Sequence, residues 1–171
     1  MQFGITIPLQ KHLKIKKLPY GEQLDLFYCW ELHIIRRQGK QTLVAVNASN
    51  RFGIVLWGMK ALQWKNIEKV MENGIRSGFL SEGYTEQQVN QYFEKAGEII
   101  LTKTHGRSPV ATLNWMIECM GYLPVLMDEK QLFQTIQCHE INRNFCHAAG
   151  FTDYGLPVEF LETDMKRIGI L

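Results

Sequence analysis

Apolar and polar residues alternate in several short runs, and these runs predict the strands of a sheet. Over residues 27–37 the alternation places Trp30 and Leu32 on one face and Glu31 and His33 on the other. Successive side chains of a strand point to opposite faces, so this run has two different sides, and the Trp30 side is the better core face. The same reasoning predicts further strands at residues 3–7, 42–48 (completing an antiparallel hairpin with 27–37), 51–57 and 98–104.

In other parts of the chain, apolar residues recur every three or four positions and predict amphipathic helices. Trp64, Ile67 and Met71 begin such a pattern. Thr85 and Gln88 match a capping box at the start of another helix. Helices are predicted at residues 8–15, 64–79, 85–97, from 109 onward, and 156–168. Around 137–139 the apolar direction reverses, which predicts either a break or a helix buried on two sides.

These elements predict an α+β fold with a mostly antiparallel sheet of four to five strands and helices packed on it. The chain has 171 residues, which suits a single domain over 1–171. Its sheet-containing part is expected over 1–108 and its helical C-terminal part over 109–171.

Charge is distributed unevenly, although the net charge is only +2. Residues 1–76 hold 12 Lys and Arg against 5 Asp and Glu, whereas the rest of the chain is acidic. Lysines at 11, 14, 16 and 17 contribute much of this asymmetry. These lysines could form a basic face that binds nucleic acid or an acidic protein. The alternative is that they are only the solvent-exposed side chains of one helix and the loop that follows it.

The four cysteines have no CxxC spacing, which favours reduced thiols and a cytoplasmic protein. Apolar runs are too short to span a bilayer, so no membrane partner is expected. The oligomeric state is left open.

The densest cluster of candidate binding residues is Lys103-Thr104-His105-Gly106-Arg107-Ser108-Pro109. Ser108 is a favoured N-cap and Pro109 a favoured first helical residue, so helix amides would lie beside Lys103 and Arg107. Helix amides flanked by cations can bind an anion. The alternative is that the cations pair with acidic side chains and Ser108 only caps a helix.

A second polar cluster interrupts the apolar strands at Asn47, Asn50 and Arg51. Asn residues can adopt a positive φ angle in a turn, and Arg51 could bind a phosphate or carboxylate. If the strand that ends at Lys103 were adjacent to the strand that begins at Arg51, the two clusters could share one end of the sheet. The candidate anion-binding residues are Arg51, Lys103, Thr104, Arg107 and Ser108, with Asn47, Asn50 and Asn114 in orienting roles.

Few motifs of enzyme chemistry occur. His139-Glu140 begins an HExxH pattern, but Arg143 stands where the second histidine would be. The pairs Cys138-His139 and Cys146-His147 would be too far apart on one helix to share a zinc ion. No metal or cofactor is therefore expected. His105 is the one candidate for general acid–base catalysis, because it lies among groups that could stabilise charge.

Residues 27 to about 115 resemble a bacterial family known only as a domain of unknown function. The resemblance rests on Trp30, on Asn47 with Arg51 and Phe52, and on Lys103-Thr104 with Arg107 and Asn114. In that pattern His often follows the Trp, whereas this chain has Glu31. The resemblance implies a small bacterial protein linked to a plasmid or phage, and it supplies no catalytic residue.

The leading expectation is a non-enzymatic binding protein of a bacterium or mobile element that recognises an anionic partner, with nucleic acid favoured slightly over an acidic protein. One alternative is a small hydrolase or transferase acting on a phosphorylated substrate. Another is a phage-type inhibitor or adaptor that binds a larger protein through exposed aromatic side chains such as Trp57, Trp64 or Tyr154.

Overall fold

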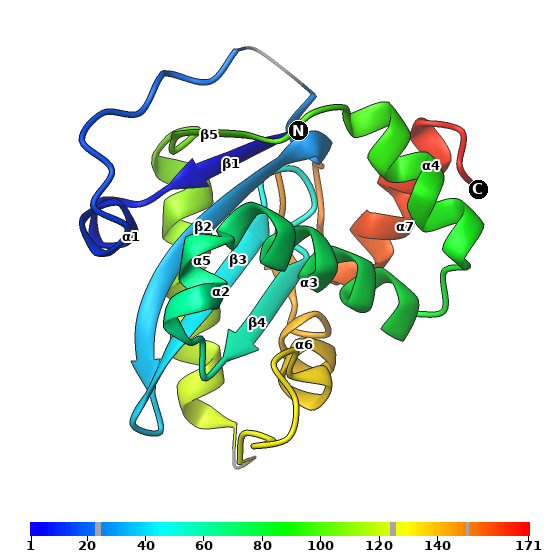
Figure 1. The fold of residues 1–171 in the computed structure, drawn as a ribbon. Helices are drawn as coiled ribbons and strands as arrows, with labels where there is room; N and C mark the ends of the chain where they lie inside the picture. Colours follow the sequence, from blue (N-terminus) through cyan, green and yellow to red (C-terminus); the bar gives the residue numbers. More distant parts are fainter. Residues whose placement is uncertain (23–24, 124–125, 150) are drawn as a thin grey trace.

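A five-stranded mixed sheet forms the centre of the protein (Figure 1). The computed structural model describes residues 1–22, 25–123, 126–149 and 151–171. The strand order is β4-β3-β2-β1-β5, with β1 parallel to both of its neighbours and β2, β3 and β4 antiparallel in turn. The strands are β1 (Gln2–Ile5), β2 (Cys29–Arg37), β3 (Lys40–Asn47), β4 (Gly53–Trp57) and β5 (Ile100–Lys103).

Helices cover both faces of this sheet, so the predicted α+β fold is confirmed. One face carries α2 and α3, and the opposite face carries α5 (Figure 1). The helices are α1 (Ile7–His12), α2 (Ala61–Lys65), α3 (Ile67–Ser81), α4 (Glu86–Ala96), α5 (Arg107–Tyr122), α6 (Thr135–Ile141) and α7 (Pro157–Arg167), with a short 3-10 turn η1 (Leu26–Tyr28).

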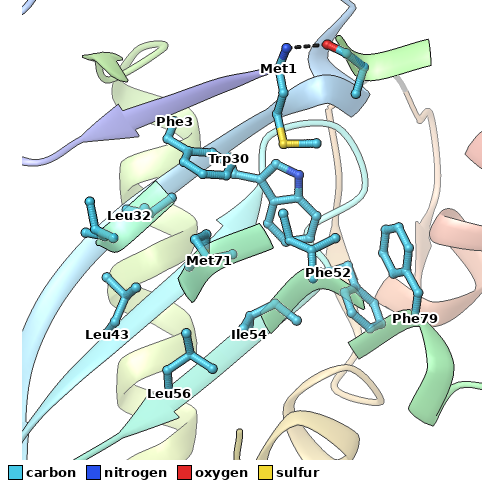
Figure 2. Close-up of a cluster of buried hydrophobic side chains, with 14 of the residues drawn as sticks. Met1, Phe3, Trp30, Leu32, Leu43, Phe52, Ile54, Leu56, Met71 and Phe79 are labelled. Carbon is cyan, nitrogen blue, oxygen red and sulfur yellow. Dashed lines mark hydrogen bonds between the residues drawn. The ribbon is translucent and has the colours of Figure 1, made fainter. Parts of the chain in front are cut away.

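The larger hydrophobic core lies between the sheet and the α3 side of the protein. Trp30 is fully buried there and packs near Phe3, Met71 and Phe79 (Figure 2). The Trp30 indole N–H donates to the Tyr92 hydroxyl at 3.0 Å, which satisfies its one polar atom. The predicted core face of β2 is therefore confirmed.

A second core lies beneath α5 on the opposite face of the sheet. It joins Val44 and Val55 of the sheet to Leu113 and Met116 of α5. Toward β1 and β2 this face becomes polar, because Gln2 and Glu31 are buried on the α5 side. The candidate site lies in this polar layer at β1 and β2, next to the apolar core beneath α5.

The hairpin between β2 and β3 forms as the sequence predicts. Gln38 and Gly39 both adopt positive φ angles, 45° and 78°, as a two-residue hairpin turn requires. Thr85 and Gln88 also form the predicted capping box, with the Gln88 N–H donating to the Thr85 hydroxyl at 3.3 Å. Both features are local patterns that the surrounding packing does not override.

Three expected helix boundaries were wrong. The helix predicted at 8–15 is α1, which ends at His12, and Lys14 then adopts a φ angle of 56°. The helix predicted at 64–79 is divided into α2 and α3 at Asn66. The third error concerns the start of α5, which begins at Arg107 with Gly106 as its N-cap. Ser108 is therefore inside the first turn rather than at the N-cap, and Gly106 adopts a φ angle of 125° that favours glycine.

The C-terminal part is mainly helical, as expected, and also contains a small hairpin of β6 (Cys146–His147) and β7 (Tyr154–Gly155). Residues 137–139 lie inside the continuous helix α6, so no break occurs there, and the helix ends at Ile141. In the described part of the chain, no helix is long and apolar enough to cross a membrane.

Candidate functional site

A buried ion pair between Glu31 and His105 lies at the polar end of the α5 face. The Glu31 side chain is fully buried and only 8% of the His105 side chain is exposed. His105 Nδ1 lies 2.6 Å from Glu31 Oε1, and the His105 backbone N–H donates to the same oxygen at 2.8 Å. The pair therefore fastens the segment between β5 and α5 to the middle of the sheet.

Gln2 holds the other side of the His105 ring. His105 Nε2 lies 2.8 Å from Gln2 Oε1, and Gln2 Nε2 donates to the Glu22 carbonyl at 3.2 Å. The Glu22 carbonyl can only accept, so it fixes the Gln2 amide with its oxygen toward the ring. Both ring nitrogens therefore face acceptors, and only the protonated imidazolium donates to both.

The pKa of His105 agrees with this hydrogen bonding. Burial lowers the pKa, but the contacts with Cys29 and Glu31 outweigh burial and raise it to about 9. At neutral pH the histidine is thus a cation within the polar layer.

Gly4 provides the space for the Glu31 carboxylate. A Cβ atom at position 4 would overlap Glu31 Oε2. This oxygen is buried and accepts no hydrogen bond from any residue within the described ranges. The side chain is therefore confined by the backbone of β1 as well as by His105.

Thr104 and Asn114 line a small cavity next to this layer. The cavity has a volume of about 210 Å³ and also includes Thr6 and His33. The Thr6 hydroxyl lies 2.8 Å from His33 Nδ1, and burial lowers the pKa of His33. Two of the predicted residues thus line the same cavity, while the anion-binding role of Thr104 and the orienting role of Asn114 stay predictions.

Asn47 and Asn50 both stabilise the turn between β3 and β4. Asn47 Nδ2 donates to the Phe27 carbonyl at 2.8 Å, and Asn47 Oδ1 accepts from the Ser49 and Asn50 N–H groups. Asn50 Oδ1 accepts from the Phe52 N–H at 3.0 Å. The polar atoms of both amides are engaged with the protein, which matches the simple turn interpretation.

Arg51, rather than either asparagine, has the positive φ angle in this turn, at 67°. Arg51 is 5% exposed, and it lines an open cavity together with Thr112 and Trp115 of α5. Burial lowers the pKa of Arg51, while Cys146 and Glu31 act in the opposite direction. We call this space the Arg51 cavity.

The strand order separates Arg51 from Lys103. The strand β4, which follows Arg51, forms one edge of the sheet, and β5, which ends at Lys103, forms the other. These two edge strands run in the same direction, so the start of β4 and the end of β5 are also at opposite ends. The adjacency that would have joined the two clusters is therefore not formed.

Lys103 instead belongs to a group of exposed lysines around the β5 edge. Its ammonium group lies 3.8 Å from the centre of the Tyr20 ring, and its backbone N–H donates to the Pro19 carbonyl at 2.9 Å. Arg107 is exposed at the first residue of α5. The side chain of Ser108 is outside the described part of the structure.

We define the lysine surface as Lys11, Lys14, Lys16, Lys17, Lys65 and Lys103. All six are exposed, and none forms an ion pair within the described ranges. Of the six, Lys65 lines a groove of about 420 Å³ that also includes Leu13, Ile15, Trp64 and Leu101. Lys14 and Lys16 flank Ile15 of this lining in the sequence. The His12 and Trp64 rings are 4.7 Å apart, which places α1 beside α2. The sequence showed the lysine cluster at 11–17 but not its proximity to α2 and β5.

The C-terminal Cys–His pairs have no common centre. Cys138 Sγ accepts from the Val55 N–H at 3.2 Å, and burial raises the pKa of this thiol to about 12. Cys146 lies in the separate β6–β7 hairpin. Among the described residues, no group of three or more His, Cys, Asp or Glu could hold a metal ion.

The sheet, its polar layer and the lysine surface define an α+β protein with a buried ion pair and an exposed group of lysines. The chain belongs to the family described as Domain of unknown function (DUF6933), whose model matches residues 2–160. The expected membership of such a family is confirmed, and the match extends beyond 27–115 to include β1 and most of the C-terminal part. No curated protein matches the chain.

Proposed function

We propose that this protein is a non-enzymatic binding protein for an anionic partner, and that nucleic acid is the favoured partner. The observation that carries the proposal is the lysine surface, where six exposed lysines have no acidic partner within the described ranges. Uncompensated cations attract a phosphate backbone because binding releases its condensed counterions. Paired lysines would contribute far less.

The groove within the lysine surface adds contacts that are not electrostatic. Leu13, Ile15 and Leu101 give it apolar walls, and Glu68 brings one acidic group. Apolar walls beside cations favour a nucleotide chain, which has flat bases as well as phosphates. An acidic protein would use the cations but would need the walls less.

Tyr20 supplies an exposed aromatic ring at the border of this surface. Tyr20 is 80% exposed, and one face of its ring contacts the Lys103 ammonium group. Exposed rings next to cations stack with the bases of single-stranded nucleic acids. Tyr20 therefore favours single-stranded over double-stranded nucleic acid.

The backbone at Lys14 also supports a binding role. Lys14 has a φ angle of 56°, in the left-handed region where glycine usually ends a helix. A lysine there costs stability that a glycine would not, and such strain clusters at functional positions. The positive charge of Lys14 at this strained position is consistent with a contact to the anionic partner.

The enzymatic alternative has less support. Both ring nitrogens of His105 are engaged by Glu31 and Gln2, so the ring presents no nitrogen to a substrate.

The protein-binding alternative needs exposed aromatic anchors, but Trp57 and Trp64 are only 5% and 6% exposed. Tyr154 is exposed, and its ring stacks with that of Phe145.

The bacterial or mobile-element setting and the cytoplasmic location remain parts of this proposal. The first rests on the resemblance of residues 27–115. The second rests on the four cysteines, all of which are free thiols.

A binding titration tests the proposal. Fluorescence polarisation with labelled single-stranded RNA, single-stranded DNA and duplex DNA should give binding at low salt, strongest for the single strands. Affinity should fall steeply between about 50 and 200 mM salt. Absence of binding to all three at low salt would contradict the proposal.

A further inference from the structure

The Arg51 cavity lies apart from the lysine surface and has the composition of a small-molecule site. Its volume is about 330 Å³, at the lower end of the range for ligand pockets of roughly 300–1,000 Å³. Three separate parts of the chain form it: the β3–β4 turn, one side of α5, and the β6–β7 hairpin. Such convergence of distant segments is typical of a binding site.

Aromatic side chains form the rim of this cavity. Phe145 and Tyr154 are each 66% exposed, and their rings stack with centres 6.4 Å apart and planes inclined by 15°. The His147 ring meets the Tyr154 ring edge-on at 5.5 Å, and Trp115 lines the cavity from α5. A small hairpin gains little stability from exposed rings, whereas a flat ligand would bury them.

The charges around the cavity favour an anion. Arg51 is a nearly buried cation in its lining, and burial raises the pKa of the neighbouring Cys146 thiol to about 11, so that thiol is uncharged at neutral pH. Glu31 acts on Arg51 from a distance but is already bonded to the His105 cation. Arg51 therefore supplies a cationic group to the lining of this cavity.

We propose that the Arg51 cavity binds a planar aromatic anion, with the ring of the ligand between Phe145, Tyr154 and Trp115 and its anionic group directed at Arg51. A guanidinium group suits this role because its planar donors match both carboxylates and phosphates. The anionic group can thus come from an aromatic carboxylate or from a nucleotide phosphate.

Isothermal titration calorimetry with the full chain tests this proposal and distinguishes the two sources. The probes are AMP and 2-naphthoate, with adenosine, 2-naphthamide and inorganic phosphate as matched controls. At least one aromatic anion should bind tenfold or more tightly than its neutral counterpart and than inorganic phosphate. Binding of AMP alone identifies a phosphate ligand, and binding of 2-naphthoate alone identifies a carboxylate ligand. If neither binds at millimolar concentration, the proposal is wrong.

Rim variants locate the binding site. Tyr154→Ala and Phe145→Ala change exposed side chains and should each weaken binding of the aromatic anion about tenfold. The matched control is Tyr122→Ala, which removes a 79% exposed tyrosine at the end of α5 and should leave affinity within twofold. Arg51→Lys should also weaken binding, and the rim variants carry the test if this buried variant fails to fold. Unchanged affinity in both rim variants would overturn the assignment.

Discussion

The carboxylate of Glu31 and the imidazole of His105 are 74 positions apart in the sequence and 2.6 Å apart in the structure. This contact joins β2 to the segment before α5, and Gln2 of β1 completes it. Because all three groups are buried or nearly so, the contact stabilises the α5 face of the sheet at β1 and β2.

Removing the negative charge of this pair should destabilise the fold. Glu31→Gln would leave the His105 cation without its buried counter-charge, at a cost of about 3 kcal/mol in the free energy of unfolding. Urea denaturation measures the loss. The matched control is Glu140→Gln, because Glu140 forms a half-exposed pair with His139 at 3.7 Å and its loss should cost under about 0.5 kcal/mol. Equal effects of the two substitutions would contradict a buried ion pair.

Stability should fall as pH rises from neutral into the alkaline range. The folded pKa of His105 is about 9, above its ordinary value of 6.5, so the folded state retains a proton that the unfolded chain releases. The resulting stabilisation is complete below pH 6.5 and is lost as pH passes about 9. Its size is on the order of 2 kcal/mol.

The comparison with His105→Gln isolates this effect. Burial lowers the pKa of the Met1 amino group, which acts in the opposite direction and is common to both proteins. Urea denaturation at about pH 6 and about pH 9.5 should give a larger loss for the wild-type chain than for the variant. Parallel pH profiles would show that His105 does not hold the extra proton.

Substituting Lys14 should separate stability from binding. Lys14→Gly relieves the left-handed backbone and should raise the free energy of unfolding by about 0.5 to 1 kcal/mol. The same substitution removes a charge from the lysine surface and should weaken oligonucleotide binding. Lys14→Ala loses the charge without relieving the backbone, so it should weaken binding with no gain in thermal stability. A Lys14→Gly variant that binds as well as wild type would remove Lys14 from the binding surface.

Asn47 should prove to be a structural residue. Asn47→Asp keeps an acceptor for the Ser49 and Asn50 N–H groups but loses the donor to Phe27, at a cost of about 1 to 3 kcal/mol. The exposed Asn90→Ala substitution is the control and should cost under about 0.5 kcal/mol. Thermal unfolding of the two variants measures the difference. If Asn47→Asp were as stable as wild type and bound anions less well, the orienting role would regain support.

Much of the fold followed from local patterns. The alternation over residues 27–37 and the strand pattern at 42–48 predicted the hairpin, because the strand period acts within a few residues. The start of α5 was missed because Gly106 could adopt a φ angle of 125° and serve as N-cap two residues earlier than expected from Ser108 and Pro109. Competing capping residues differ by too little free energy to be ranked from sequence alone.

The site was less predictable because it depends on contacts between distant segments. His105 was a candidate, but Glu31 was not, although the alternation placed Glu31 on the face opposite the core. Nothing in the sequence indicated that β1 would insert between β2 and β5 and bring Gln2 to the ring. The same insertion separates Lys103 from Arg51, so one expected anion site became two separate surfaces.

The proposed binding of nucleic acid by the lysine surface is tested most directly by the salt dependence of binding. The variant Lys16→Gln/Lys17→Gln is compared with Lys95→Gln/Lys130→Gln, which removes the same charge from exposed positions outside the surface. With a single-stranded probe, the slope of log K against log salt should become shallower by about 1.4 in the first variant and stay unchanged in the second. Identical slopes in the two variants would mean that binding follows net charge alone, and the lysine surface would not be the binding site.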